Sequence, residues 1–151
     1  MAEKVFENKE SMGMKIHSDG TVTALILEKG EPIHESLKEL ARDLDIPGAF
    51  ITGIGAVKDV VIAFFDMQSK GYKESKLEGV LELLGLNGDI SWEGDEPVIH
   101  LHAVLGFEDG SVMGGHLLGA NIGVTGEIFI HKTGERLERG MVEEFNLSLI
   151  K

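Results

Sequence analysis

The chain has 151 residues, of which 14 are basic and 26 are acidic, so its formal net charge is −12 at pH 7. A surface with this charge repels phosphate backbones and anionic lipids, which disfavours direct binding to DNA or to a membrane. The sequence contains no cysteine, which excludes disulfide bonds and thiolate metal sites and agrees with a reducing compartment.

The length is typical of one domain, and we predict a single domain over residues 1–151 with an ordered core from about residue 12 to residue 150. The N-terminal ten residues, MAEKVFENKE, contain no apolar stretch of signal-peptide length. No apolar run approaches the roughly 18 residues that span a bilayer. We therefore expect a soluble, cytoplasmic protein that does not insert into a membrane.

The first elements that the sequence predicts are a hairpin and one helix. Residues 15–17 and 21–27 flank the turn signal Ser18-Asp19-Gly20. Apolar residues then recur at helical spacing opposite a charged face, and they are Ile33, Leu37, Leu40, Ala41 and Leu44. This pattern predicts a helix that packs one side on a sheet and ends at Pro47-Gly48.

The middle of the chain is rich in glycine and predicts strands. Ala49–Val57 and Val60–Phe65 are apolar runs separated by Lys58-Asp59, which fits a pair of strands. Leu77–Leu86 fits helix or strand by propensity, but the glycines around it and the turn signal Asn87-Gly88 favour strand and turn.

The last part of the chain predicts further strands. A strand at Ile90–Glu93 and a polar loop at Gly94–Pro97 lead into a histidine-containing hairpin, Val98–Leu118. Strands at Asn121–His131 and around Val142–Ile150 complete the chain. One amphipathic helix packed on a mostly antiparallel sheet of roughly eight to ten short strands is an α+β fold.

The stretch Val98–Leu118 reads VIHLHAVLGFEDGSVMGGHLL and carries three of the six histidines. His100 and His102 lie two apart, so in a strand they point to the same face, roughly 7 Å from each other. His116 follows Gly114-Gly115, where missing side chains leave room for a close approach. Histidine is the commonest metal ligand, and three histidines leave a tetrahedral ion one open position.

The length of the hairpin loop decides whether His116 joins the other two. A two-residue loop, Asp109-Gly110, places His116 opposite Ala103, so that it points away from His102. A three-residue loop over 108–110 with left-handed Gly110 places His116 opposite His102, with Cβ atoms about 5 Å apart. We expect the three-residue loop, and a bulge at Gly114-Gly115 is a second route to the same face. The alternative is that these are structural strand histidines bonded to neighbours.

Two carboxylates and a glycine pair are further candidates. Glu82 and Glu127 lie within apolar runs, where a carboxylate is paired, hydrogen-bonded or protonated. They are candidates for second-shell partners or a general base near the histidines, or else outward-facing or ion-paired residues. Gly53 and Gly55 form a GxG that no predicted helix follows, so we interpret them, like Gly114 and Gly115, as close-approach glycines rather than a dinucleotide site.

Four segments resemble the plant and prokaryote conserved domain, called the PPC domain. They are ITGIGAV at Ile51–Val57, EGVLELLGLNGDIS at Glu78–Ser91, HLHAVLGFEDGSVMGGHLL at His100–Leu118, and TGEIFI at Thr125–Ile130. The resemblance covers the chain from about residue 12 to residue 150. It implies an α+β domain that is built on an antiparallel sheet and assembles as a homotrimer.

The resemblance also implies functions. Plant members carry AT-hook motifs before the domain and use it for assembly in DNA-binding proteins, whereas prokaryotic members are free-standing. Some prokaryotic members resemble metal-containing proteins whose HxH and GGH histidines are ligands, which here are His100, His102 and His116. The chain lacks the Arg-Gly-Arg AT-hook and a basic extension, so the resemblance does not imply direct DNA binding here.

Three functions follow as hypotheses. The first is a homotrimeric protein with a zinc-type site, binding zinc or a similar divalent metal at the three histidines. The second is a regulatory or assembly module without catalysis of its own, in which the histidines are structural. The third, direct DNA binding, is opposed by the net charge of −12. The sequence identifies no substrate.

Overall fold

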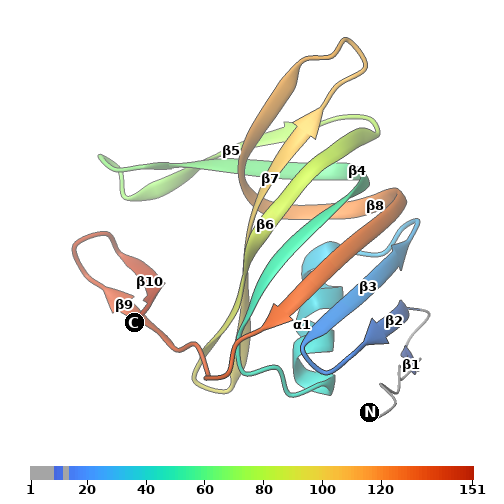
Figure 1. The fold of residues 1–151 in the computed structure, drawn as a ribbon. Coiled ribbons are helices and arrows are strands. Elements are labelled where there is room, and N and C mark those ends of the chain that lie inside the picture. Colours follow the sequence, from blue (N-terminus) through green and yellow to red (C-terminus); the bar gives the residue numbers. More distant parts are fainter. Residues whose placement is uncertain (1–8, 12–13) are drawn as a thin grey trace.

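The structure is a computed structural model that describes residues 9–11 and 14–151. These residues form ten strands and one helix, which confirms the α+β class (Figure 1). The expectation that the N-terminal ten residues are not a signal peptide falls mostly on residues 1–8, which lie outside the described residues. None of the helices formed by the described residues has the length and apolarity needed to span a membrane.

Eight strands form one antiparallel sheet in the order β1-β2-β3-β8-β7-β6-β4-β5. Their bounds are β1 (Lys9–Ser11), β2 (Met14–Ser18), β3 (Val22–Glu28), β4 (Ala49–Asp66), β5 (Gly71–Leu77), β6 (Leu81–Glu93), β7 (Glu96–Gly106) and β8 (Val112–Lys132). Two further strands, β9 (Arg139–Val142) and β10 (Leu147–Ile150), pair with each other as a separate hairpin.

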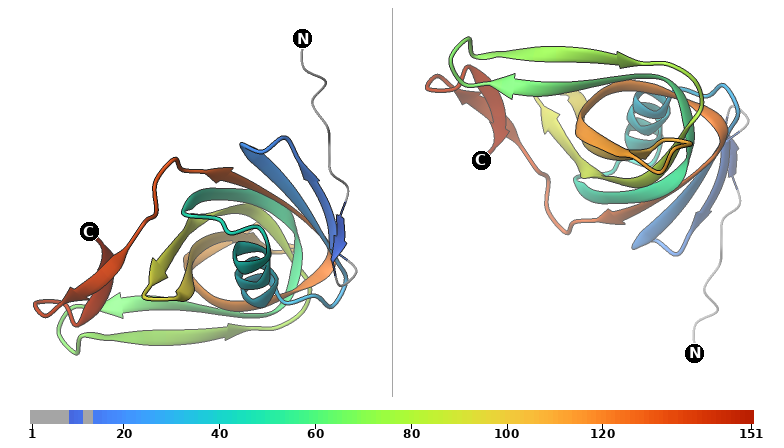
Figure 2. Two further views of the ribbon diagram at one scale, coloured as in Figure 1. Left: turned by 90° about the horizontal axis from the view of Figure 1, so that it is seen from below. Right: turned by 90° about the horizontal axis from the view of Figure 1, so that it is seen from above.

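The sheet closes on itself because β8 pairs with three strands. It pairs with β3, with β7 and along most of its length with β4, while β4 pairs with β6 and β6 with β7. The strands β8, β7, β6 and β4 thus form a closed ring. Seen from its ends in Figure 2, the sheet curls around the single helix, α1 (Ile33–Asp43).

The core lies between α1 and the inner face of the sheet. The apolar stripe that the sequence predicted is the buried side of the helix, and Ile33, Leu37 and Leu40 are at most 1% exposed. The sheet contributes the alternate residues of its strands, among them Leu86, Leu101 and Leu105. Burying each such side chain contributes about 1.5–3 kcal/mol, so this interface fixes which face of every strand points outward.

The predicted break at Lys58-Asp59 is wrong, because β4 is one strand from Ala49 to Asp66. Asp59 has a left-handed φ of 54°, and the register with β8 shifts between Lys58 and Val61. The Asp59 carboxylate accepts a hydrogen bond from the Asn121 side chain at 3.1 Å. The polar pair therefore marks a bend within one paired strand, where the sheet curls, and not a turn between two strands.

The predicted turn at Asn87-Gly88 is wrong as well, since β6 continues from Leu81 to Glu93. Gly88 pairs with Ile51 on one side and with Leu101 on the other. A side chain on Gly88 would collide with the backbone carbonyl of His100, so this glycine permits close strand packing rather than a turn. The actual turn is Gly94-Asp95, shorter than the predicted loop over 94–97.

Two other boundaries differ from the prediction. The segment Asn121–His131 is part of the long strand β8, because pairing with β4 continues through it. The last predicted strand, around Val142–Ile150, is instead the hairpin β9–β10, whose turn contains Asn146 with a left-handed φ of 56°.

Candidate metal centre

The hairpin between β7 and β8 has the three-residue loop that we expected. The Phe107 N–H donates to the Ser111 carbonyl at 3.0 Å, and the Gly110 N–H donates back to the Phe107 carbonyl at 2.9 Å. Gly110 has φ +82°, which a glycine adopts without steric cost. The Asp109 carboxylate accepts hydrogen bonds from the N–H and the hydroxyl of Ser111. The loop therefore closes with His102 directly opposite His116.

The structure brings the three predicted histidines together on the outer face of the sheet. One ligand nitrogen from each of His100, His102 and His116 lies within 4.8 Å of the other two. Their ring centroids are separated by 5.1–5.3 Å. Tetrahedral zinc with Zn–N bonds of about 2.0–2.1 Å holds its nitrogens about 3.4 Å apart. Small side-chain rotations would therefore bring these nitrogens to ligand spacing.

The electrostatics of the cluster favour the neutral form of two imidazoles, those of His102 and His116. Burial, followed by the charges that protonated His100 and His102 would carry, lowers the pKa of His116 to about 4. Burial, followed by His100, also lowers the pKa of His102. A neutral imidazole offers a free lone pair, so His102 and His116 can accept a cation without first losing a proton.

A carboxylate that the sequence analysis missed contacts the cluster. Asp89 on β6 lies directly opposite His100, and its Oδ2 is 3.3 Å from His100 Nδ1. Burial alone would raise the pKa of Asp89, but hydrogen bonds from His100, Ser91 and Arg139, with the charge of Arg139, lower it overall. Asp89 is therefore a carboxylate. The two-residue turn Gly94-Asp95 was the available signal, because counting outward from it places Asp89 opposite His100.

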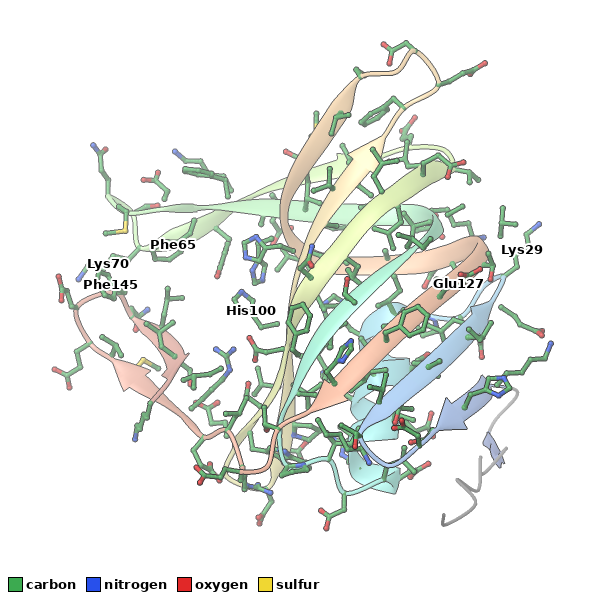
Figure 3. The ribbon with its side chains drawn as sticks, viewed as in Figure 1. Lys29, Phe65, Lys70, His100, Glu127 and Phe145 are labelled. Carbon is green, nitrogen blue, oxygen red and sulfur yellow. The ribbon has the colours of Figure 1, made fainter. Side chains whose placement is uncertain are left out.

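Aromatic rings cover one side of the cluster. The Tyr72 ring centroid is 4.8 Å from that of His116, and Phe65 contacts Tyr72 edge-on at 5.3 Å. Phe65 and Tyr72 are opposite each other on β4 and β5, so the projecting end of that strand pair forms this wall (Figure 3). The Tyr72 ring thus packs against the His116 ring on this side.

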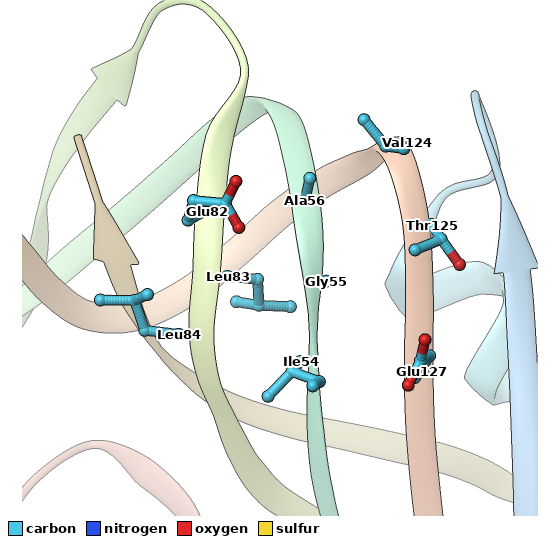
Figure 4. Close-up of a pocket in the computed structure, with 9 residues that line it drawn as sticks. All are labelled: Ile54, Gly55, Ala56, Glu82, Leu83, Leu84, Val124, Thr125 and Glu127. Carbon is cyan, nitrogen blue, oxygen red and sulfur yellow. The ribbon is translucent and has the colours of Figure 1, made fainter. Parts of the chain in front are cut away.

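The two predicted glutamates, Glu82 and Glu127, lie away from the histidine cluster. Together with Ile54, Leu84 and Val124 they line a hollow of about 470 Å³ on the outer face of β4, β6 and β8 (Figure 4). Glu82 pairs with Gly106, several residues from the histidines along the strands, and Glu127 is far from His100 in Figure 3. The structure thus places Asp89, rather than either glutamate, in contact with a histidine of the cluster.

The four predicted close-approach glycines lie where strands press together. A Cβ on Gly53 or Gly115 would stand 2.9 Å from a carbonyl oxygen of β8 or β4, and one on Gly114 would stand 2.8 Å from the carbonyl of Ala103. A Cβ on Gly55 would collide with the carbonyl of Thr125. Gly114 and Gly115 keep β8 close to β7 and β4 just before His116, which helps to place that histidine.

The model of the Plants and Prokaryotes Conserved (PCC) domain, also written PPC, matches residues 14–134. The chain belongs to this family. No curated protein matches the sequence.

Several solved structures resemble this PPC-family protein. A PPC protein from Pyrococcus horikoshii is 30% identical, with a TM-score of 0.81 and coverage of 95% of this chain and 97% of that one. A metal-containing protein from Archaeoglobus fulgidus is 32% identical, with a TM-score of 0.80 and coverage of 98% and 99%. A protein from Bacteroides thetaiotaomicron, provisionally described as DNA-binding, is 25% identical, with a TM-score of 0.87 and coverage of 91% and 96%.

Proposed function

We propose that this PPC-family protein binds zinc or a similar divalent metal at His100, His102 and His116. The convergence of three imidazoles, with one nitrogen of each within 4.8 Å of the others, carries the proposal. The metal-containing protein from Archaeoglobus fulgidus, 32% identical over nearly the whole chain, supports it.

The residues around the histidines define what the site does with an ion. Three imidazoles leave a tetrahedral zinc ion one position for water or another ligand, where the ion acts as a Lewis acid. Asp89 accepts a hydrogen bond from His100 and holds its ring, and Tyr72 packs against His116. We assign no substrate.

We further propose that the chain assembles as a homotrimer, as the family resemblance implies. Large apolar side chains are exposed on the outer sheet face, and a patch of this kind marks an interaction surface. Phe50, Ile54, Leu84 and Val124 are 50–64% exposed, and Phe129 is 38% exposed. The same exposed face favours the second candidate, a regulatory or assembly module whose histidines bind no metal. Direct DNA binding is opposed by the net charge of −12.

The first experiment measures the zinc content of protein purified without a histidine tag, comparing wild type with His102→Ala. We expect about one ion per chain in the wild type and loss of the ion in the variant without unfolding. His17→Ala, at an exposed histidine on β2, is the matched control and should keep the ion. A wild type that stays free of metal after zinc is supplied would refute the metal site.

The second experiment measures mass by light scattering after size exclusion. A homotrimer of the 16.4 kDa chain should give three times that mass, and Ile54→Lys should lower it. A trimer without metal would support the assembly module instead. Salt-sensitive retention of DNA by the wild type would contradict the argument from net charge.

A further inference from the structure

One buried side chain of the C-terminal hairpin β9–β10 contacts the carboxylate beside the histidine cluster. Arg139, the first residue of β9, has a side chain only 7% exposed. Its Nη2 donates to both carboxylate oxygens of Asp89, at 3.0 and 3.2 Å, and its Nε donates to the Ser91 hydroxyl at 2.6 Å. Its Nη1 donates to the backbone carbonyl of Ser148 on β10 at 2.8 Å.

Ser91 and Arg139 together hold the Asp89 carboxylate. The Ser91 hydroxyl donates to Asp89 Oδ1 at 2.8 Å while it accepts from Arg139. Asp89 Oδ2 also lies 3.3 Å from His100 Nδ1. With Nδ1 engaged in this hydrogen bond, Nε2 is the nitrogen that His100 offers to an ion, because a ligating histidine donates its other N–H to an outer partner.

We propose that Arg139 sets the metal affinity of the histidine site by holding Asp89 where it orients the His100 ring. The inference rests on the proposed function. Arg139 and Ser148 lie beyond residues 14–134, the region that matches the family model, so this positioning comes from a segment outside that match. Asp89 and Arg139 are positioning residues, since neither would contact the ion.

The direction in which zinc affinity changes when Arg139 is replaced distinguishes positioning of Asp89 from a purely electrostatic effect of the Arg139 charge. Arg139 places a positive charge near the histidines, so removing it would strengthen cation binding if only the electric field mattered. If Arg139 positions Asp89, Arg139→Gln weakens binding instead. Arg139→Lys keeps the charge but lacks the planar guanidinium, whose Nε and Nη1 bind Ser91 and Ser148 while Nη2 contacts Asp89, so it also weakens binding.

The fold around Arg139 retains other contacts in these variants. The backbone N–H of Trp92 donates to the Leu137 carbonyl at 2.8 Å, and the Arg136 guanidinium lies over the Trp92 ring at 4.2 Å. These contacts tie the segment before β9 to β6 independently of Arg139. Arg139→Lys also keeps a cation beside Asp89, so it provides a folded variant if Arg139→Gln fails to fold.

The test titrates zinc against a chelating dye for wild type, Asp89→Asn, Arg139→Gln and Arg139→Lys. We expect zinc binding about 10–100-fold weaker for Asp89→Asn and about tenfold weaker for the Arg139 variants, as outer-shell changes cause. The double variant Asp89→Asn/Arg139→Gln should bind zinc no more weakly than Asp89→Asn alone, because both substitutions act through the contact between Asp89 and His100. Arg42→Gln, in an exposed ion pair with Glu96, is the control and should bind as the wild type does.

A second readout needs no metal. In metal-free protein at neutral pH, nitrogen NMR should find the His100 proton on Nδ1 in the wild type and shared between both nitrogens in Arg139→Gln. Unchanged or tighter zinc binding by the Arg139 variants, or an unchanged His100 tautomer, would overturn this inference but not the proposed function. A wild type that binds no zinc would overturn the proposed function and the role in affinity, while the tautomer would still report whether Arg139 positions Asp89.

Discussion

His102 and His116 lie directly opposite each other across β7 and β8, with the Phe107–Ser111 pair closing the loop beyond them. The side-chain period of a strand is two residues, so a shift by one residue would turn His116 to the other face. The clustering of the three histidines therefore depends on the register that a loop several residues away sets.

Inserting one alanine between Gly106 and Phe107 should abolish zinc binding. The three-residue loop and the Phe107–Ser111 pair are kept, so the extra residue shifts the rest of β7 by one position and places His116 opposite Ala103. Zinc content by elemental analysis, with circular dichroism to verify folding, measures the outcome. Deleting Glu108 instead leaves the two-residue turn Asp109-Gly110 with Phe107 still opposite Ser111, so this control should retain the ion. A folded insertion variant with full zinc content would show that the register adjusts elsewhere.

The stability of the metal-free protein should fall as the pH falls from about 6.5 to 4. The pKa of His116 is lowered to about 4 in the folded state, whereas in the unfolded chain a histidine has its usual pKa of about 6.5. Between these values the unfolded state binds a proton that the folded state does not, so lower pH favours unfolding. Urea midpoints at pH 7 and pH 5 test this.

Comparison with His116→Gln isolates the contribution of this residue. The variant should lose less stability between pH 7 and pH 5 than the wild type does. Part of the loss should remain, because the pKa values of His34 and His102 are lowered as well, mainly by burial. An equal loss in both proteins would show that His116 does not contribute.

Leu101→Ala should destabilise the fold by about 2–5 kcal/mol, because it leaves a cavity in a packed core. Leu101 is fully buried and lies between His100 and His102, on the opposite face of β7. Val104→Ala on the same strand is the control. Val104 is 42% exposed, so its substitution should reduce the free energy of unfolding much less. Urea unfolding of both variants measures the difference, and equal losses would contradict the assigned core face.

Gly88→Ala should weaken both the fold and the metal site. A methyl group at Gly88 would collide with the His100 carbonyl and push β6 away from β7, separating Asp89 from His100. We expect a lower melting temperature and weaker zinc binding. Gly119→Ala, where a Cβ would meet no atom within 4 Å, is the matched control. A Gly88→Ala variant with wild-type stability and zinc affinity would contradict this, because it would show that β6 and β7 accommodate the methyl group.

The sequence by itself determined the fold class, the buried face of α1 and the three histidines. Each of these depends on local spacing: a helical repeat in Ile33–Leu44, the alternation of His100 and His102, and a loop with a glycine suited to left-handed φ. The resemblance to the PPC domain implied the same fold class and the same three histidines. Local chemistry suffices where one element or one hairpin sets the geometry.

Only the tertiary structure decided which polar residues surround the histidines. Asn87-Gly88 has the composition of a turn, but pairing with strands on both sides keeps β6 extended and brings Asp89 opposite His100. Arg139 reaches the same carboxylate from fifty residues along the chain, through a separate hairpin. Glu82 and Glu127 instead share a hollow around β4. These contacts depend on strand order and sheet closure, which distant pairings set and local propensity does not specify.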